Sequence, residues 1–177
     1  MIFKTCAFTG HRPQSLPWRF NETDQNCLRL KEILTQQIAN LAGKGITDFL
    51  SGMALGVDTW AAEIVLSLRE NNPALKLHCI LPCKTQAEKW PIPAQERYKM
   101  ILKQADSIVY TSRNYHTNCI LERNRFMVEN TSLLLVIYDK HKQRSGTGAT
   151  LRYAQKLGRK IIIIDPISLG ITGLEQI

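Results

Sequence analysis

A glycine-containing turn near residue 50 has residue types that bind phosphate. It contains Ser51, Gly52, Gly56 and Asp58, and it joins an apolar, strand-like run to a run with helical periodicity. Backbone N–H groups at such a turn, together with the positive end of the helix dipole, stabilise an anion. Glycine has no Cβ, so a ligand can approach these groups closely. Asp58 can cap N–H groups or accept hydrogen bonds from a ribose. The same residues also fit a tight turn that only connects two elements.

A second turn repeats this arrangement further along the chain. It contains Gly146, Thr147 and Thr150, and it joins the apolar run 133–138 to a helical pattern. Thr147 is the expected N-cap of that helix. In a parallel sheet both turns face the same edge, so two helix N-termini could converge on one phosphate or pyrophosphate.

Arg123 and Asn124 lie on the helical pattern that precedes the second turn. Arg123 shares a helix face with Met127 one turn later, and Met127 fits a core position. An arginine above the core at the sheet edge can bind a phosphate with two parallel hydrogen bonds. A solvated arginine paired with an acid is the alternative. On the first interpretation, Arg123→Ala weakens nucleotide binding and leaves the stability of the free protein nearly unchanged. Asn124 can read the edge of a base or cap a loop.

A third candidate group follows the apolar run 3–9 directly. It consists of Gly10, His11 and Arg12. Loops in this position bind ligands in parallel α/β proteins, although Pro13 is also typical of a rigid turn.

The elements that must position these residues alternate between strands and helices. Strands are predicted at 3–9, 46–50, 75–81, 107–111, 133–138 and 161–164, and helices from 21–24 to 43 and at 57–68, 94–105, 120–130 and 147–157. The alternation predicts an α/β fold: one Rossmann-like domain over residues 1–177, with a mostly parallel sheet and helices on both faces. Ligand loops are expected at 10–17, 51–57, 112–118 and 139–148, beyond the carboxyl ends of the strands. The segment after Pro166 is too short to assign.

Charge and composition limit the class of partner. Lys and Arg number 23 against 15 Asp and Glu, which gives a formal charge of +8. This excess permits a phosphorylated small molecule or a nucleic acid as partner. No apolar run approaches the about 20 residues that span a bilayer, and the N-terminus lacks the pattern of a signal peptide. We therefore predict a cytoplasmic protein without a membrane partner, and a homo-oligomer is an open alternative.

The cysteines do not indicate a metal site. There are five, an odd number, and they are widely scattered. The segment from His78 to Cys83 has no matching second pair at zinc spacing. We therefore predict neither a metal site nor a cofactor.

Four blocks of sequence together resemble the YpsA family, a domain of unknown function. They are Thr9–Pro13 (TGHRP), Ser51–Asp58 (SGMALGVD), Glu122–Val128 (ERNRFMV) and Ser145–Thr150 (SGTGAT). The family lies in the SLOG superfamily, which joins the DNA-processing Smf proteins to the Lonely Guy phosphoribohydrolases. The resemblance covers almost the whole chain and implies a Rossmann-like fold.

The enzyme branch of this superfamily cleaves the N-glycosidic bond of nucleoside 5′-monophosphates. Of its Arg-Lys-x-x-Met motif this chain keeps Arg123 and Met127 but not the lysine. Its later motif, Pro-Gly-Gly-x-Gly-Thr-x-x-Glu, corresponds here to Gly146–Thr150, so Thr150 stands at the position of the catalytic glutamate. Glycosidic cleavage needs a carboxylate for proton transfer or to stabilise a developing cation. We therefore predict no catalytic residues, although Asp58, Glu63 or Glu122 could substitute.

The leading hypothesis is a module that binds a nucleotide or a derivative such as an ADP-ribose-like molecule, as a sensor or by sequestration, without catalysis. A glycosidase with altered catalytic residues is one alternative. A single-stranded DNA-binding protein is the other, because the DNA branch shares the block from Ser51 to Asp58. Single-strand binders usually add aromatic platforms. Tyr110, Arg113, Tyr115 and His116 form one candidate stripe, although we favour a strand end followed by a loop. The predicted ligand-binding residues are Gly10, His11, Arg12, Ser51, Gly52, Gly56, Asp58, Arg123, Asn124, Gly146, Thr147 and Thr150.

Overall fold

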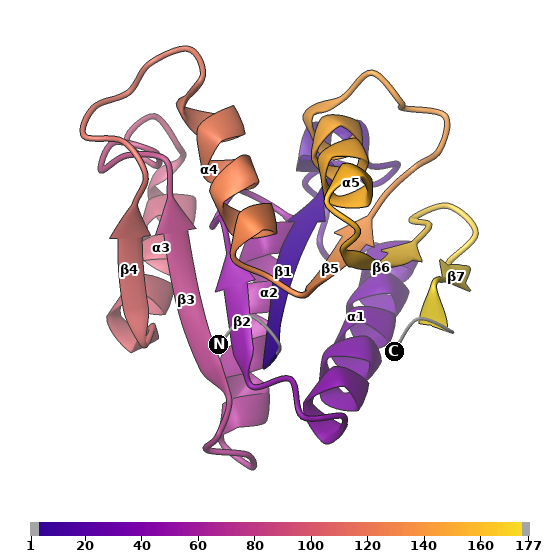
Figure 1. The fold of residues 1–177 in the computed structure, drawn as a ribbon. Coiled ribbons are helices and arrows are strands. Elements are labelled where there is room, and N and C mark those ends of the chain that lie inside the picture. The colour runs from indigo at the N-terminus through magenta and orange to yellow at the C-terminus, as the bar shows by residue number, and fades with distance from the viewer. Residues whose placement is uncertain (1–3, 175–177) are drawn as a thin grey trace.

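The computed structural model describes residues 4–174, whose strands form one sheet of seven in the order β4-β3-β2-β1-β5-β6-β7 (Figure 1). The strands are β1 (Thr5–Gly10), β2 (Asp48–Ser51), β3 (Lys76–Leu81), β4 (Ser107–Tyr110), β5 (Leu133–Ile137), β6 (Lys160–Ile164) and β7 (Ile171–Thr172). All neighbours pair in parallel except β6 and β7. This confirms the predicted fold class. β7 was not predicted, because two residues are too few to form a pattern.

Helices cover both faces of the sheet, as the alternation predicted (Figure 1). The helices are α1 (Gln25–Gly43), α2 (Val57–Arg69), α3 (Ile92–Gln104), α4 (Cys119–Glu129) and α5 (Gly146–Lys156), with a short 3-10 turn η2 at Pro13–Ser15. α1, α2 and α3 pack on one face, and α4 and α5 on the other. Asp24 caps α1 by accepting a hydrogen bond of 2.8 Å from the N–H of Asn26, within the predicted start region.

Side chains of the central strand divide between two apolar clusters. Cys6 and Phe8 contribute to the larger cluster beneath α1, α2 and α3, whereas Ala7 belongs to the cluster beneath α4 and α5. Successive strand side chains point to opposite faces, so both faces of β1 are buried. β5 is also buried throughout, as expected for a parallel strand covered on both sides.

The order of strands reverses at β1. β2, β3 and β4 lie on one side of β1, and β5, β6 and β7 on the other. The loops that follow β1 and β5 therefore meet at their carboxyl ends, where the N–H of Asp139 donates to Nε2 of His11 at 3.0 Å. Such a switch point is where open α/β sheets bind ligands.

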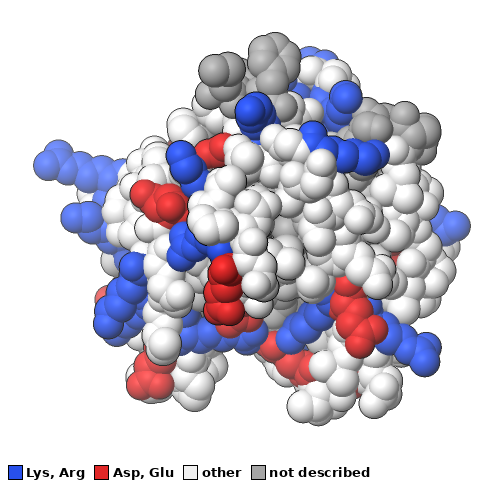
Figure 2. All heavy atoms as spheres, turned by 90° about the horizontal axis from the view of Figure 1, so that it is seen from below, with Lys and Arg blue, Asp and Glu red and all other residues white. Residues whose placement is uncertain are grey.

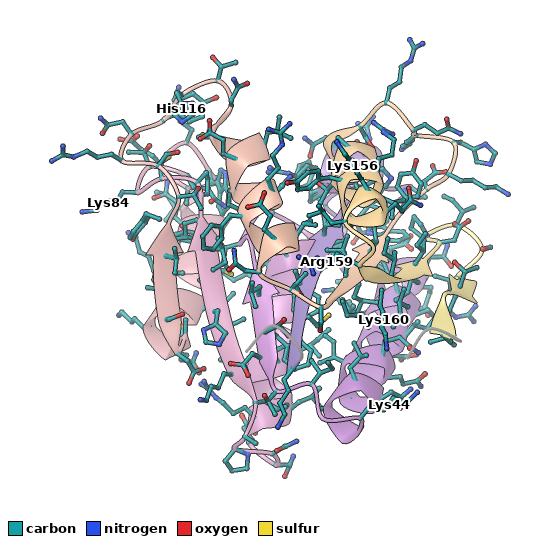
Figure 3. The ribbon with its side chains drawn as sticks, viewed as in Figure 1. Lys44, Lys84, His116, Lys156, Arg159 and Lys160 are labelled. Carbon is teal, nitrogen blue, oxygen red and sulfur yellow. The ribbon has the colours of Figure 1, made fainter. Side chains whose placement is uncertain are left out.

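Arg159 holds the end of α4 that lies away from this edge. Its Nε donates to the carbonyl of Val128, and its Nη2 donates to that of Glu129, each at 3.0 Å (Figure 3). A cation suits the last carbonyls of a helix, where the dipole is negative. The end of α4 is therefore held by the residue that directly precedes β6.

The amino ends of the strands do not form a basic face. Figure 2 views the molecule from this side and shows acidic and basic side chains interspersed. Within residues 4–174, no helix is long and apolar enough to cross a membrane. In the same range, no three His, Cys, Asp or Glu side chains gather as metal ligands.

A network of ion pairs joins α3 to α2 and to the segment before α1. Arg97 donates to Glu63 at 2.6 Å and to Glu22 at 2.7 Å, and Lys31 donates to Glu22 at 2.5 Å. Burial raises the pKa of Glu22, but the hydrogen bonds from Arg97 and Lys31 outweigh it and bring this pKa to about 2. The ionised carboxylate of Glu22 therefore stabilises the fold.

We expect Glu22→Gln to reduce the acid sensitivity of the protein. A carboxyl group whose pKa is lowered on folding stabilises the folded state fully at pH values above its pKa in the unfolded chain, here 4.5. This stabilisation is lost as the pH falls toward the folded-state pKa of about 2. Urea unfolding at pH 7 and at pH 3 measures the effect. The wild type should lose more free energy of unfolding between these values than Glu22→Gln does. Glu32→Gln, at an exposed position of α1, should behave as wild type. Equal losses in all three proteins would contradict this role.

Candidate functional site

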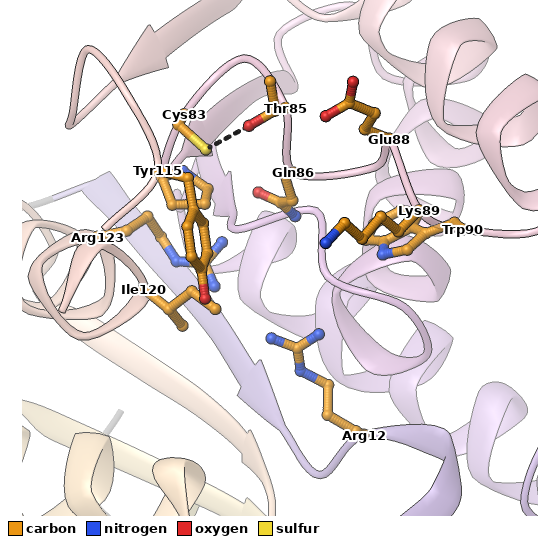
Figure 4. Close-up of a pocket in the computed structure, with 11 residues that line it drawn as sticks. Arg12, Cys83, Thr85, Gln86, Glu88, Lys89, Trp90, Tyr115, Ile120 and Arg123 are labelled. Carbon is orange, nitrogen blue, oxygen red and sulfur yellow. Dashed lines mark hydrogen bonds between the residues drawn. The ribbon is translucent and has the colours of Figure 1, made fainter. Parts of the chain in front are cut away.

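A cleft with two lobes lies over the carboxyl ends of the strands. The smaller lobe has a volume of ≈ 240 Å³ and lies between the loops after β1 and β5 and the start of α5. The larger lobe has a volume of ≈ 450 Å³ and lies beside the loops after β3 and β4 (Figure 4). Arg12, Ile120 and Arg123 line both lobes. The lobes therefore adjoin at two cationic side chains.

Arg123 is buried at this junction, with 3% of its surface exposed. Its Nε donates to Oδ1 of Asn124 at 2.8 Å, and its Nη1 donates to the carbonyl of Gly52 and, at 3.4 Å, to that of Ile80. Nη2 has no hydrogen-bond partner within residues 4–174. A Cβ at Gly52 would collide with the guanidinium, so glycine is required here to admit the arginine. The side chain is thus fixed by backbone carbonyls and keeps one nitrogen for a ligand.

Asp58 occupies the N-terminus of α2. Its Oδ2 accepts a hydrogen bond of 3.2 Å from the N–H of Ala54, and the side chain is buried in the wall of the smaller lobe. Burial raises the pKa of this carboxyl, and the positive charges of Arg123 and Arg12 partly offset the effect. The first glycine turn is therefore filled by a carboxylate of the protein. It does not offer the open helix N-terminus that its sequence suggested.

The N-terminus of α5 does open on the smaller lobe. Gly146 and Thr147 line the lobe, and a Cβ at Gly146 would meet no atom within 4 Å. The N-cap is Ser145, whose Oγ accepts a hydrogen bond of 3.1 Å from the N–H of Gly148. The expected cap at Thr147 was wrong, because the helix begins one residue before it. This turn presents a helix dipole and uncovered backbone to the cleft.

His11 ties the two loops of the switch point together. Its Nε2 accepts the N–H of Asp139, and its ring stacks on Tyr138 with the centroids 5.5 Å apart. Burial lowers the pKa of His11, and the charge of Lys142 lowers it further. The ring is therefore neutral near pH 7, with its proton on Nδ1. His11 shapes the lobe without adding charge to it.

The sequence that builds this site matches a known protein family. The model of the YpsA family, described as the YspA SLOG family, matches residues 6–169. The chain belongs to the YpsA family. The UPF0398 protein YpsA of Bacillus subtilis is 31% identical over 144 residues, which cover 80% of this chain and 79% of that protein. A UPF0398 protein of Bacillus pumilus is 36% identical over 138 residues, covering 77% of this chain and 74% of the relative.

A solved structure shares the fold of this YpsA-family protein. It is DNA processing protein A from Helicobacter pylori, described for its single-stranded DNA binding mode, with a TM-score of 0.59 and 21% sequence identity. The match covers 90% of this chain but 64% of that chain. The likeness supports the α/β architecture.

Most of the predicted ligand-binding residues of this YpsA-family protein line the smaller lobe. These are Gly10, His11, Arg12, Asp58, Arg123, Asn124, Gly146 and Thr147. The others lie elsewhere. Ser51 bonds to the backbone of Asp58, Gly52 lies against Arg123, and Gly56 lines a separate small cavity with Trp60. Thr150 donates to the carbonyl of Gly146 at 2.9 Å and accepts from Asn124 at 3.2 Å, so it joins α4 to α5.

Sequence reasoning missed much of the larger lobe. Gln86, Lys89 and Trp90 line it, from the loop between β3 and α3, together with Ile120 and Tyr115 (Figure 4). The rule that placed ligand loops after strands also applies to β3 and would have indicated this loop. Tyr115 was considered only as part of a stripe for nucleic acid. Its side chain is 68% exposed at the rim of the lobe.

Proposed function

We propose that this protein binds a nucleotide or a nucleotide derivative in the two-lobed cleft, as a sensor or by sequestration, without catalysis. The ligand class is a nucleoside phosphate or an ADP-ribose-like molecule. One observation carries the proposal: the start of α5, Arg12 and Arg123 all line the smaller lobe. A helix N-terminus and two guanidinium groups around one cavity suit a phosphate or pyrophosphate.

The larger lobe supports the rest of such a ligand. Trp90, Tyr115 and Ile120 give it aromatic and apolar walls, and it meets the smaller lobe at Arg12 and Arg123. Nucleotide pockets combine apolar walls for the base with a few polar groups that fix orientation. A base in the larger lobe and a phosphate at α5 would place the negative charge beside both arginines.

A glycosidase remains the alternative that a specific observation favours. The carboxyl of Asp58 lines the smaller lobe, and burial raises its pKa. A raised carboxyl pKa suits a general acid near neutral pH. By contrast, the hydroxyl of Thr150 is bonded within the fold, and a hydroxyl is a poor substitute for the glutamate of the enzyme branch. Single-stranded DNA is the second alternative, supported by the function described for the H. pylori protein.

Calorimetric titration with AMP, ADP-ribose and a dT oligonucleotide tests the proposal, with thermal unfolding as the second readout. We expect a nucleotide or ADP-ribose to bind. At a ligand concentration a hundred times Kd, binding should raise the free energy of unfolding by about 2.7 kcal/mol. Oligonucleotide binding should be weak and lost at physiological salt, since charge alone would drive it.

The same mixtures separate the alternatives. Release of adenine from AMP, abolished in Asp58→Asn, would favour the glycosidase. Tight oligonucleotide binding at physiological salt, lost in Tyr115→Ala, would favour the DNA-binding protein. If none of the ligands binds, the proposal is wrong.

A further inference from the structure

The amide of Gln86 is held in one orientation. Its Nε2 donates to the carbonyl of Gly52 at 3.1 Å and to the carbonyl of Met53 at 2.8 Å. Both partners accept hydrogen bonds and cannot donate them. Rotating the amide by half a turn would place its own oxygen against two carbonyl oxygens, which is unfavourable. The position of the Gln86 oxygen is therefore determined by its neighbours.

That oxygen lacks a partner. Oε1 of Gln86 is buried and accepts no hydrogen bond from any residue in the range 4–174, although the side chain lines the larger lobe. In Figure 4 the oxygen is turned toward the side of the lobe that Tyr115 and Cys83 line. Buried acceptors without a donor are rare in native proteins and call for an explanation. A bound ligand with an N–H donor provides one.

We propose that the larger lobe binds adenine and that Gln86 is its specificity-determining residue, accepting a hydrogen bond from the 6-amino group. This inference rests on the proposed function and names the base. Trp90 and Tyr115 supply aromatic surface for a purine. Gln86 offers one acceptor, because its Nε2 is already committed to Gly52 and Met53. Adenine has one donor group on its base, whereas guanine would bring two that need acceptors.

Gln86, the proposed contact to the base, is linked through the backbone to Arg123, the proposed contact to the phosphate. The carbonyl of Gly52 accepts hydrogen bonds both from Nη1 of Arg123 and from Nε2 of Gln86. One backbone carbonyl therefore fixes the positions of these two side chains relative to each other. A ligand must satisfy Gln86 and Arg123 together, which favours an intact nucleotide over free adenine or free phosphate.

The test compares two ligands that differ only at the 6-position. AMP carries the amino group, and purine riboside 5′-monophosphate carries hydrogen there and has no N–H donor on its base. We expect the full chain to bind AMP at least about tenfold more tightly, because the analogue leaves the Gln86 oxygen unpaired. In Gln86→Leu the acceptor is absent, and the ratio of the two Kd values should fall to about one.

Gln104→Leu is the matched control. Nε2 of Gln104 also donates to a backbone carbonyl, that of Met100 at 3.2 Å, but Gln104 is exposed on α3 and neither of these residues lines the lobe. This variant should keep the preference for AMP. If Gln86→Leu does not fold, the ratio of the two Kd values in the wild type still tests the role of Gln86.

The outcomes distinguish this inference from the function on which it rests. Equal affinity of the wild type for AMP and the analogue would overturn the role of Gln86 and leave nucleotide binding in place. Tighter binding of GMP than of AMP would overturn the assignment of adenine. If AMP, GMP and ADP-ribose all fail to bind, the proposed function itself fails.

Discussion

Arg123→Ala is expected to lower the free energy of unfolding by about 3 kcal/mol and to weaken nucleotide binding ten- to a hundredfold. The side chain is almost fully buried. Its removal leaves the carbonyls of Gly52 and Ile80 without this donor and takes from the carboxyl of Asp58 one of its two neighbouring positive charges, so that only Arg12 remains. The sequence had suggested that this substitution spares the fold, whereas the burial of the guanidinium leads us to expect a loss of stability. Urea unfolding and titration with AMP measure the two effects.

Arg125→Ala provides the control on the same helix. Arg125 is exposed and lies over the ring of Tyr153 at 5.6 Å. Its loss should change the free energy of unfolding by no more than about 0.5 kcal/mol and leave AMP binding unchanged. Wild-type stability in Arg123→Ala would mean that the buried guanidinium does not support the loop at Gly52.

Gly146→Val is expected to reduce nucleotide binding by at least about a hundredfold, or about 2.7 kcal/mol, while the fold is retained. Gly146 lines the smaller lobe, and a Cβ there meets no atom of the protein within 4 Å. The valine side chain can therefore be accommodated by the free protein, but it would fill the space that a phosphate needs. Titration with AMP and thermal unfolding measure binding and folding separately.

Gly43→Val controls for the substitution itself. Gly43 also has no atom within 4 Å of its Cβ position, but it is exposed at the end of α1. Both binding and stability should stay near those of the wild type. If Gly146→Val bound AMP as well as Gly43→Val does, the smaller lobe would not be the phosphate site.

The fold could be predicted because each element carries a local pattern. Asp24 and Gly43 lie at the two ends of α1, where a cap and a helix stop are expected. Short apolar runs such as Leu133–Ile137 indicate strands buried on both faces. β7 has no such pattern, and its pairing with β6 depends on a turn that the sequence did not reveal.

The site could be predicted only in part. The turn at Gly146 follows a strand, so its place at the carboxyl edge came from local reasoning. The helix period placed Arg123 on the face of the buried Met127, but the burial of its guanidinium was not predicted, because the charge was expected to reach a ligand at the sheet edge. The larger lobe combines loops after β3 and β4 with Arg12. No sequence pattern brings these together, because their proximity depends on the order of strands.

The reversal of strand order at β1 has a consequence for the synthesis of the protein. The bond between Asp139 and His11 joins residues 128 apart in the sequence, whereas β1, β2, β3 and β4 pair with neighbours in chain order. On the ribosome we expect β1, β2, β3 and β4 to associate first, because pairing segments that are near in sequence closes shorter loops at a lower entropic cost. The cleft forms only after β5 and α5 have been made. A nucleotide would therefore stabilise the finished chain and offer no help to a nascent one.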